Sequence, residues 1–201
     1  MKPTVIGITG GIGCGKSRVC SQFNAFGIDT YDADGRAKKL YFSEPELLKE
    51  VQINFPEAFE GENLNLRLLG NIVFFDFQKL QLLNKIIAPF MFKDFNSWLQ
   101  QDFYNPKLVL IESAILLDSE LKKICTEIVY VYAPESIRID RTLKRDNRTL
   151  EQVKKIIEIQ RKPEDFISEC FYVINNSGDY YRLEKQILRL HDIFNGENSY
   201  I

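Results

Sequence analysis

The sequence has few cysteines, a single histidine and no long hydrophobic run. A membrane-spanning helix needs about 18 consecutive apolar residues, and neither such a run nor an apolar leader with a small-residue cleavage site occurs. The sequence has 26 basic and 28 acidic residues, so its net charge is close to zero. No positive electrostatic field over the whole molecule therefore favours binding to nucleic acid or to a membrane surface, and any anion site must be local. We expect a cytoplasmic protein that binds neither nucleic acid nor membranes.

The scarce residue types also exclude several kinds of site. The four cysteines form no C-x-x-C pair, which argues against zinc and against a disulfide framework and fits a reducing compartment. The single histidine, His191, follows apolar residues at helical spacing, so we expect it on a helix face without a catalytic role. The remaining composition, 45% hydrophobic and 27% charged over 201 residues, is typical of one globular domain.

Short apolar runs alternate with helical patterns along the chain. The candidate strands, in chain order, are residues 5–9, 28–31, 108–111, 128–132 and 172–174. This alternation predicts an α/β fold with a parallel sheet flanked by helices. Residues 44–104 show a helical pattern and no alternating strand, which indicates a helical insertion. Ser43-Glu44-Pro45-Glu46 is expected to form a capping box at the start of its first helix.

The most specific motif is Gly10-Gly11-Ile12-Gly13-Cys14-Gly15-Lys16-Ser17, which fits G-x-x-x-x-G-K-S/T between a predicted strand and a predicted helix. In such a P-loop the glycines let backbone N–H groups surround phosphate oxygens, and the helix N-terminus favours negative charge. Lys16 would reach the β- and γ-phosphates and Ser17 could bind Mg²⁺. The alternative, a glycine-rich turn without function, does not account for the Lys-Ser pair in this context.

Other motifs choose among the classes of P-loop protein. A GTPase switch should carry Asn-Lys-x-Asp, but Asn84-Lys85 has no following Asp and lies in a helical pattern. The Leu-Ser-Gly-Gly-Gln signature of an ABC-type ATPase is also missing from the sequence. A chain of this size, with a helical insertion and an arginine-rich segment near residue 140, is better explained as a small-molecule kinase.

Asp32-Ala33-Asp34 follows the second candidate strand, at the end of a sheet where ligands gather in α/β folds. A carboxylate there could accept the proton of a substrate hydroxyl. The alternative is that these residues cap the next helix. Because neighbouring side chains of a strand point in opposite directions, one aspartate could be catalytic and the other structural.

An arginine-rich segment provides a candidate phosphate clamp. Arg138, Arg141 and Arg145 share one helix face, and a capping box at Thr149-x-x-Gln152 starts the next helix. Two helices with a short polar turn would make a lid whose guanidinium groups neutralise the transferred phosphate. A solvated face balanced by acidic neighbours is the alternative. Glu112, at the end of a buried strand, could orient Mg²⁺ through water or merely cap the segment.

Taken in order, these segments resemble the dephospho-CoA kinase family almost from end to end. The matching segments are Ile8–Ser17, Phe26-Gly27-Ile28 with Asp32-Ala33-Asp34, Ile72-Val73-Phe74 with Leu83-Asn84-Lys85-Ile86, Arg141–Asp146 and Val173–Gly178. The resemblance implies ATP and Mg²⁺ as cofactors and transfer of the γ-phosphate to the ribose 3′-hydroxyl of dephospho-CoA. The sequence departs from the family pattern at Arg18, Asn65-Leu66, Ala88 and Ala114-Ile115-Leu116.

The resemblance also implies roles for single residues. Asp34 is the expected base, with Lys16 and Arg141 as the other catalytic residues. The expected ATP-binding residues are Gly11, Gly13, Cys14, Gly15, Lys16, Ser17 and Arg145, and Ser17 is the expected metal ligand. Arg18, which departs from the family pattern, could add a further ATP contact or lie on an exposed helix surface. The implied parts are a nucleotide-binding core at residues 1–43, 105–133 and 163–201, a helical acceptor subdomain at 44–104 and a lid at 134–162.

Two other functions remain open at this point. The chain could be a small-molecule kinase with another hydroxyl acceptor, or a nucleotide-binding regulator that hydrolyses slowly without an acceptor. A monomer is the favoured oligomeric state.

Overall fold

A computed structural model describes residues 3–74, 76–100, 106–160 and 167–196, which fall into two compact units. The first, which we call the sheet unit, comprises residues 1–31, 106–115 and 124–201. The second, the helical unit, comprises residues 32–105 and 116–123. The three-part division into core, acceptor subdomain and lid stays a prediction.

A five-stranded sheet with the order β2-β5-β1-β6-β7 forms the centre of the sheet unit. Its strands are β1 (Thr4–Thr9), β2 (Thr30–Asp32), β5 (Leu108–Glu112), β6 (Glu127–Tyr132) and β7 (Tyr172–Asn175). The pairs β1–β5, β1–β6 and β6–β7 are parallel. This topology confirms the predicted α/β fold, and it places the carboxyl end of β1 in the middle of the sheet.

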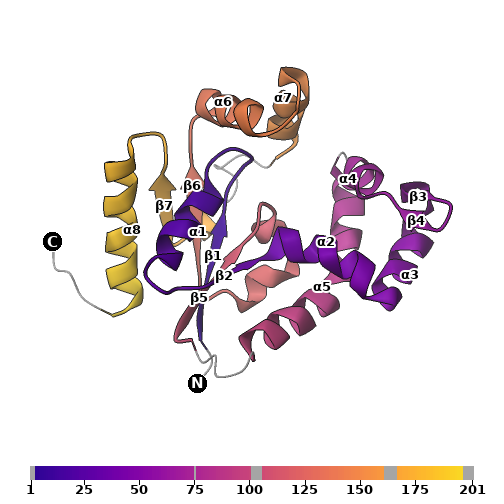
Figure 1. The fold of residues 1–201 in the computed structure, drawn as a ribbon, viewed down its shortest axis with the longest axis horizontal. Helices are drawn as coiled ribbons and strands as arrows, with labels where there is room; N and C mark the ends of the chain where they lie inside the picture. The colour runs from indigo at the N-terminus through magenta and orange to yellow at the C-terminus, as the bar shows by residue number, and fades with distance from the viewer. Residues whose placement is uncertain (1–2, 75, 101–105, 161–166, 197–201) are drawn as a thin grey trace. The chain divides into compact units, whose positions relative to one another are not determined.

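The central strands β1 and β5 are buried apolar runs, as expected for a parallel sheet covered by helices. Ile6, Ile8, Leu110, Val131 and Ile174 are all fully buried in one continuous core. Helices α1 (Lys16–Asn24) and α8 (Tyr180–Phe194) pack against each other and contribute further core residues, among which Val19 and Phe23 are fully buried. Figure 1 shows these two helices beside the sheet.

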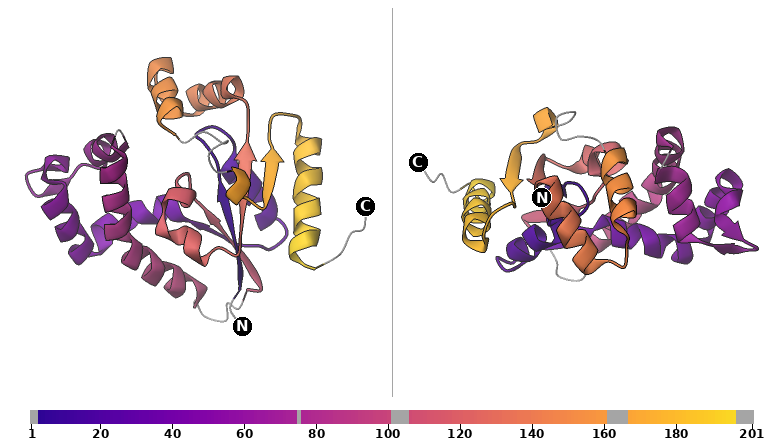
Figure 2. Two further views of the ribbon diagram at one scale, coloured as in Figure 1. Left: turned by 180° about the vertical axis from the view of Figure 1, so that it is seen from behind. Right: turned by 90° about the horizontal axis from the view of Figure 1, so that it is seen from above.

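Two helices, α6 (Glu135–Arg145) and α7 (Leu150–Ile159), follow β6 and pack against each other. Figure 1 and the left view of Figure 2 show α6 next to the loop that follows β1, at the end of the sheet to which the strands point. The predicted capping box of α7 is confirmed: the Gln152 N–H donates to Thr149 Oγ1 and the Thr149 N–H donates to Gln152 Oε1.

The helical unit confirms the predicted helical insertion. Its main helices are α2 (Ala33–Ser43), α3 (Pro45–Asn54), α4 (Leu66–Phe74) and α5 (Phe77–Leu99), with short 3-10 turns at Pro56–Ala58, Leu116–Asp118 and Glu120–Ile124. Leu47, Val51, Phe55 and Ala58 are fully buried in its core. No helix in the described ranges is both long and apolar enough to span a membrane.

Two local features of the helical unit differ from the expectations. A small antiparallel hairpin, β3 (Phe59–Glu60) with β4 (Asn63–Leu64), lies between α3 and α4, and its two-residue strands are too short to show an alternating pattern. The predicted capping box at Ser43 is wrong. Ser43 is the last residue of α2, so Glu44 is the N-cap of α3 and makes no side-chain cap hydrogen bond.

Candidate functional site

The loop between β1 and α1 is the predicted P-loop, and two of its glycines are required by the geometry. Gly13 has a φ of 74° and Gly15, the N-cap of α1, has a φ of 96°, a region that other residues rarely adopt. A Cβ atom on Gly13 would overlap the Arg138 carbonyl of α6, and one on Gly15 would overlap the Asn176 side chain. The loop therefore depends on glycine both for its conformation and for close packing.

This conformation leaves a set of backbone donors open. The Lys16 N–H bonds to the buried Cys14 thiol, whereas the N–H groups of Gly13 and Gly15 form no hydrogen bond within the part of the chain that the structure describes. They lie at the N-terminus of α1, where the helix dipole favours an anion. The Lys16 ammonium donates to the Gly10 carbonyl at 3.0 Å, so its charge stays next to the loop. The arrangement is a cradle for phosphate oxygens.

Two oxygen-bearing side chains meet beside this cradle. Ser17, in the first turn of α1, donates its hydroxyl to Glu112 Oε1 at 2.7 Å. Glu112 ends β5 and is paired in register with Ile8 of β1, which explains the meeting. The sequence left two roles open for Glu112, orienting Mg²⁺ or capping the segment. The contact with Ser17 favours the first, because it places Glu112 in the site.

The arginines of α6 separate into two groups. Arg138 Nε donates to the Ile12 carbonyl at 2.9 Å. Arg141 donates to the carbonyls of Cys14 and Asn176, at 3.4 and 3.0 Å. These two guanidinium groups therefore bind the P-loop and the loop after β7, so they are not simply a solvated face.

Arg145 behaves differently although it shares the same predicted helix face. It makes two hydrogen bonds to the Asp146 carboxylate, at 2.8 and 3.1 Å, and its side chain is 63% exposed. The hydrogen bond from Arg145 lowers the pKa of Asp146, and the same bond raises the pKa of Arg145. In the described residues, no hydrogen bond or ion pair thus joins Arg145 to the P-loop.

Cys14 sits in the loop itself and is 1% exposed. Burial raises the pKa of its thiol, so the side chain is uncharged, and its backbone N–H donates to the Gly11 carbonyl at 3.3 Å. Arg18, one turn further, lies with its guanidinium carbon 5.3 Å from the centre of the Tyr180 ring, in a cation–π contact with α8.

Two further residues hold the loop and were missed by the sequence analysis. Asn176 is buried and donates its amide to the Cys14 carbonyl at 2.8 Å. Gln160, directly after α7, accepts a hydrogen bond from the Ile12 N–H at 2.9 Å. Asn176 follows a strand end, which is a usable signal in an α/β sheet, whereas nothing in the local sequence marks Gln160.

The two aspartates after β2 take different positions in the helical unit. Asp32 is the N-cap of α2, and its Oδ1 accepts the Gly35 N–H at 2.9 Å. Asp34 lies in the first turn of α2, is half-buried and does not cap the helix. One carboxylate therefore serves the helix, and the other has no capping role.

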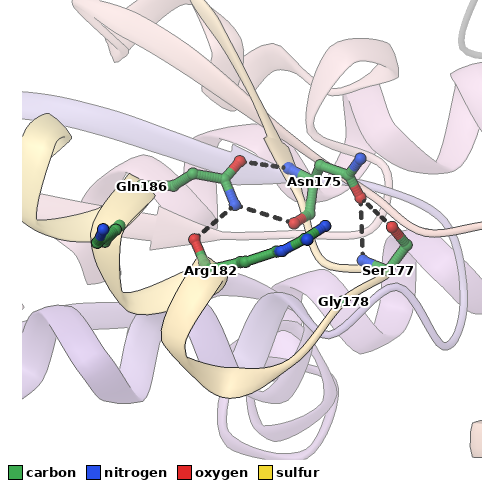
Figure 3. A pocket seen from close by; sticks show the side chains of 6 residues that line it. Asn175, Ser177, Gly178, Arg182 and Gln186 are labelled. Atoms are coloured by element: carbon green, nitrogen blue, oxygen red, sulfur yellow. Dashed lines mark hydrogen bonds between the residues drawn. The ribbon is translucent and has the colours of Figure 1, made fainter.

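A recess of about 290 Å³ lies between the end of β7 and the start of α8 (Figure 3). Its lining residues are Asn175, Ser177, Gly178, Arg182, Lys185 and Gln186. The Gln186 amide accepts from the Asn175 N–H at 2.8 Å and donates to the Asn175 carbonyl at 3.0 Å, which fixes β7 to α8. None of the predicted site residues lines this recess.

Known proteins resemble this chain over nearly its whole length. A profile of the dephospho-CoA kinase family matches residues 4–181. A dephospho-CoA kinase of Bacteroides fragilis (strain YCH46) is 35% identical over 186 residues, 92% of this chain and 90% of the relative. One of Staphylococcus aureus (strain Mu50) is 34% identical over 194 residues, 94% of this chain and 92% of the relative. The crystal structure of TT1252 from Thermus thermophilus is similar with a TM-score of 0.81 and 26% identity, over 96% of this chain and 98% of that one.

Proposed function

The chain belongs to the dephospho-CoA kinase family, and from this premise we propose how its own residues phosphorylate dephospho-CoA. The reaction transfers the γ-phosphate of ATP to the ribose 3′-hydroxyl of dephospho-CoA and gives coenzyme A and ADP. A bond forms between the 3′-oxygen and the γ-phosphorus, the bond from that phosphorus to the β-phosphate oxygen breaks, and the hydroxyl proton goes to a base. The family match confirms the resemblance to dephospho-CoA kinases and the kinase class that the sequence predicts.

The P-loop is the proposed binding site for the phosphates of ATP. The open N–H groups of Gly13 and Gly15 support this role, because oriented backbone donors at a helix N-terminus bind phosphate oxygens. We propose that the Lys16 ammonium leaves the Gly10 carbonyl for the β- and γ-phosphates. Among the residues expected to bind ATP, Gly11 and Cys14 shape the same loop, since the Cys14 N–H donates to the Gly11 carbonyl at 3.3 Å.

The proposed roles of Arg18, Arg141 and Arg145 follow from the contacts that each side chain makes. Arg141 lies against the loop and could turn its remaining donors to the transferred phosphate, which supports its catalytic assignment. Arg18 and Arg145 would have to leave Tyr180 and Asp146, respectively, to reach ATP. We propose that Arg18 and Arg145 leave these partners after ATP has bound and then serve as ATP ligands.

Mg²⁺ fits the side chains beside the cradle. The Ser17 hydroxyl and the Glu112 carboxylate supply hard oxygen donors 2.7 Å apart. The described residues contain no group of three or more His, Cys, Asp or Glu side chains that could hold a metal. Mg²⁺ commonly binds through one or two protein oxygens together with substrate phosphates, so this donor set is sufficient, with Ser17 as the direct ligand. When bound, the ion neutralises charge on the phosphate oxygens.

Asp34 is the proposed base. Asp32 is the N-cap of α2, whereas Asp34 lies in the first turn of α2 outside the cap, and we propose that its carboxylate accepts the 3′-hydroxyl proton. A base at this position both orients the hydroxyl and takes its proton as the new bond forms.

The acceptor assignment is carried by the extent of the family match, which runs from residue 4 to residue 181 and so includes the helical unit as well as the P-loop. ADP release should be measured in a coupled assay with ATP alone, with dephospho-CoA and with coenzyme A. Coenzyme A is the matched control because its 3′-oxygen already carries a phosphate. We expect ADP release only with dephospho-CoA. Equal release without any acceptor would instead indicate a nucleotide-binding regulator. The monomeric state and the cytoplasmic location remain predictions.

A further inference from the structure

Both polar groups of one peptide residue in the P-loop are bound by side chains of the α6–α7 segment. Gln160 Oε1 accepts the Ile12 N–H at 2.9 Å, and Arg138 Nε donates to the Ile12 carbonyl at 2.9 Å. Arg138 Nη2 also donates to Gln160 Oε1 at 2.9 Å, which closes a ring of three hydrogen bonds. We call this ring of Ile12, Arg138 and Gln160 the Ile12 clasp.

The surrounding loop is shaped to admit the clasp. A Cβ atom on Gly11 would overlap the Arg138 guanidinium and lie 2.9 Å from Gln160 Oε1. Arg138 is itself fixed, because its carbonyl accepts the fully buried Thr142 hydroxyl at 2.7 Å. Arg138 comes from α6 and Gln160 from the end of α7, so both helices hold the same residue of the loop.

The clasp uses donors and acceptors that the phosphates do not need. It occupies the Ile12 N–H, whereas the N–H groups of Gly13 and Gly15 stay without a partner in the described ranges. A side chain that competed with ATP would fill those open groups. The Ile12 clasp instead ties down the residue just before them, and so it holds the cradle open.

We propose that Gln160 and Arg138 are positioning residues that hold the P-loop in its phosphate-binding form before the nucleotide arrives. This inference rests on the proposed use of the P-loop for ATP. A loop without the clasp spends part of its time in forms that cannot bind, and the apparent Kd rises as the fraction of competent loop falls. The effect should be the same for ATP and ADP, because the clasp acts on the empty loop rather than on the transition state.

The test compares two substitutions at one position. Gln160→Met keeps the length of the side chain but removes the acceptor, and Gln160→Glu keeps an acceptor for both donors. We expect Gln160→Met to raise the Kd of ATP and of ADP about 10-fold, the scale of one or two lost hydrogen bonds. The kcat at saturating ATP and the KM for dephospho-CoA should stay within about 2-fold, and Gln160→Glu should restore most of the affinity.

A matched control separates the clasp from general loosening of α7. Gln152→Met breaks the capping box at the other end of α7 without touching the P-loop, and it should leave nucleotide affinity unchanged. Hydrogen exchange of the peptide covering residues 10–15, measured without nucleotide, should become faster in Gln160→Met but not in Gln152→Met.

Four results would overturn the proposed role of the Ile12 clasp. Two concern Gln160→Met itself, namely an unchanged or a tighter ATP affinity. The other two are a loss of ATP affinity in Gln152→Met or in Gln160→Glu that equals the loss in Gln160→Met. Tighter binding would show that Gln160 competes with the nucleotide. A wild-type protein that binds neither ATP nor ADP would instead refute the proposed use of the P-loop, and the clasp with it. Isothermal titration calorimetry on all four proteins distinguishes these outcomes.

Discussion

The sheet unit and the helical unit offer different chemical groups to a ligand. In the sheet unit the open groups are largely backbone N–H donors, and side chains such as Arg138, Arg141 and Asn176 hold the loop that carries them. In the helical unit the candidate group is a side chain, Asp34, on the first turn of a helix whose cap is formed by Asp32.

Because of this difference, substitutions in the two units should impair different steps, nucleotide binding in one and the chemical step in the other. A substitution in the sheet unit that disturbs the loop should weaken nucleotide binding, because the donors depend on the shape of the backbone. Loss of the Asp34 carboxylate should slow the chemical step and leave nucleotide binding intact, because the phosphates are held elsewhere. The following variants test this separation, in order of decreasing expected effect.

The largest effect is expected in the helical unit. Asp34→Asn keeps the size of the side chain but removes the basic oxygen, so turnover should fall by about 10²–10⁴-fold with the ATP affinity nearly unchanged. Asp32→Asn is the matched control, because asparagine caps helices about as well as aspartate. Initial rates and ATP binding should be measured for both. If Asp32→Asn proves the more damaging, the base has been assigned to the wrong aspartate.

In the sheet unit, Lys16→Ala removes the one ammonium of the loop. We expect turnover to fall by roughly 10²–10³-fold, as when a group that stabilises transition-state charge is removed, and ATP binding to weaken as well. Titration calorimetry alongside initial rates would show the two losses together. Turnover near that of the wild type would refute the P-loop assignment, and intact ATP affinity would remove the contrast with Asp34→Asn.

A smaller effect should separate two arginines of one helix. Arg141→Ala removes hydrogen bonds to two carbonyls around the P-loop, so we expect roughly a 10-fold loss in kcat/KM for ATP. Arg145→Ala should lower it less, since its partner is the exposed Asp146. Circular dichroism and melting curves serve as controls for folding. Equal kinetic losses would mean that Arg145 leaves Asp146 and reaches the nucleotide during the reaction.

The smallest effect concerns two helix starts. Thr149→Ala removes a formed capping box and should destabilise α7 by about 1 kcal/mol, whereas Ser43→Ala removes a hydroxyl that caps nothing. Hydrogen exchange of the first turns of α7 and α3 can follow each helix locally. A loss of protection in α3 of Ser43→Ala, equal to that in α7 of Thr149→Ala, would contradict the cap geometry described above.

The sequence by itself determined the elements whose signals are local. The apolar run before Gly10, the glycine motif and the helical spacing after it predicted β1, the P-loop and α1, and Thr149 with Gln152 predicted the cap of α7. These features depend on residues a few positions apart, so periodicity and capping rules are enough to find them. The same local rule failed at Ser43, because α2 extends through that residue and leaves no free N-cap there.

Only the tertiary structure decided how the P-loop is held. The hydrogen bonds to the loop join residues 126 positions apart for Arg138 and Ile12, 148 for Gln160 and Ile12, and 162 for Asn176 and Cys14. Helical spacing placed Arg138, Arg141 and Arg145 on one face but could not show that the third would pair with its neighbour Asp146. Spacing along a helix fixes direction around its axis, whereas the partner of each side chain depends on which distant segment folding brings to that face.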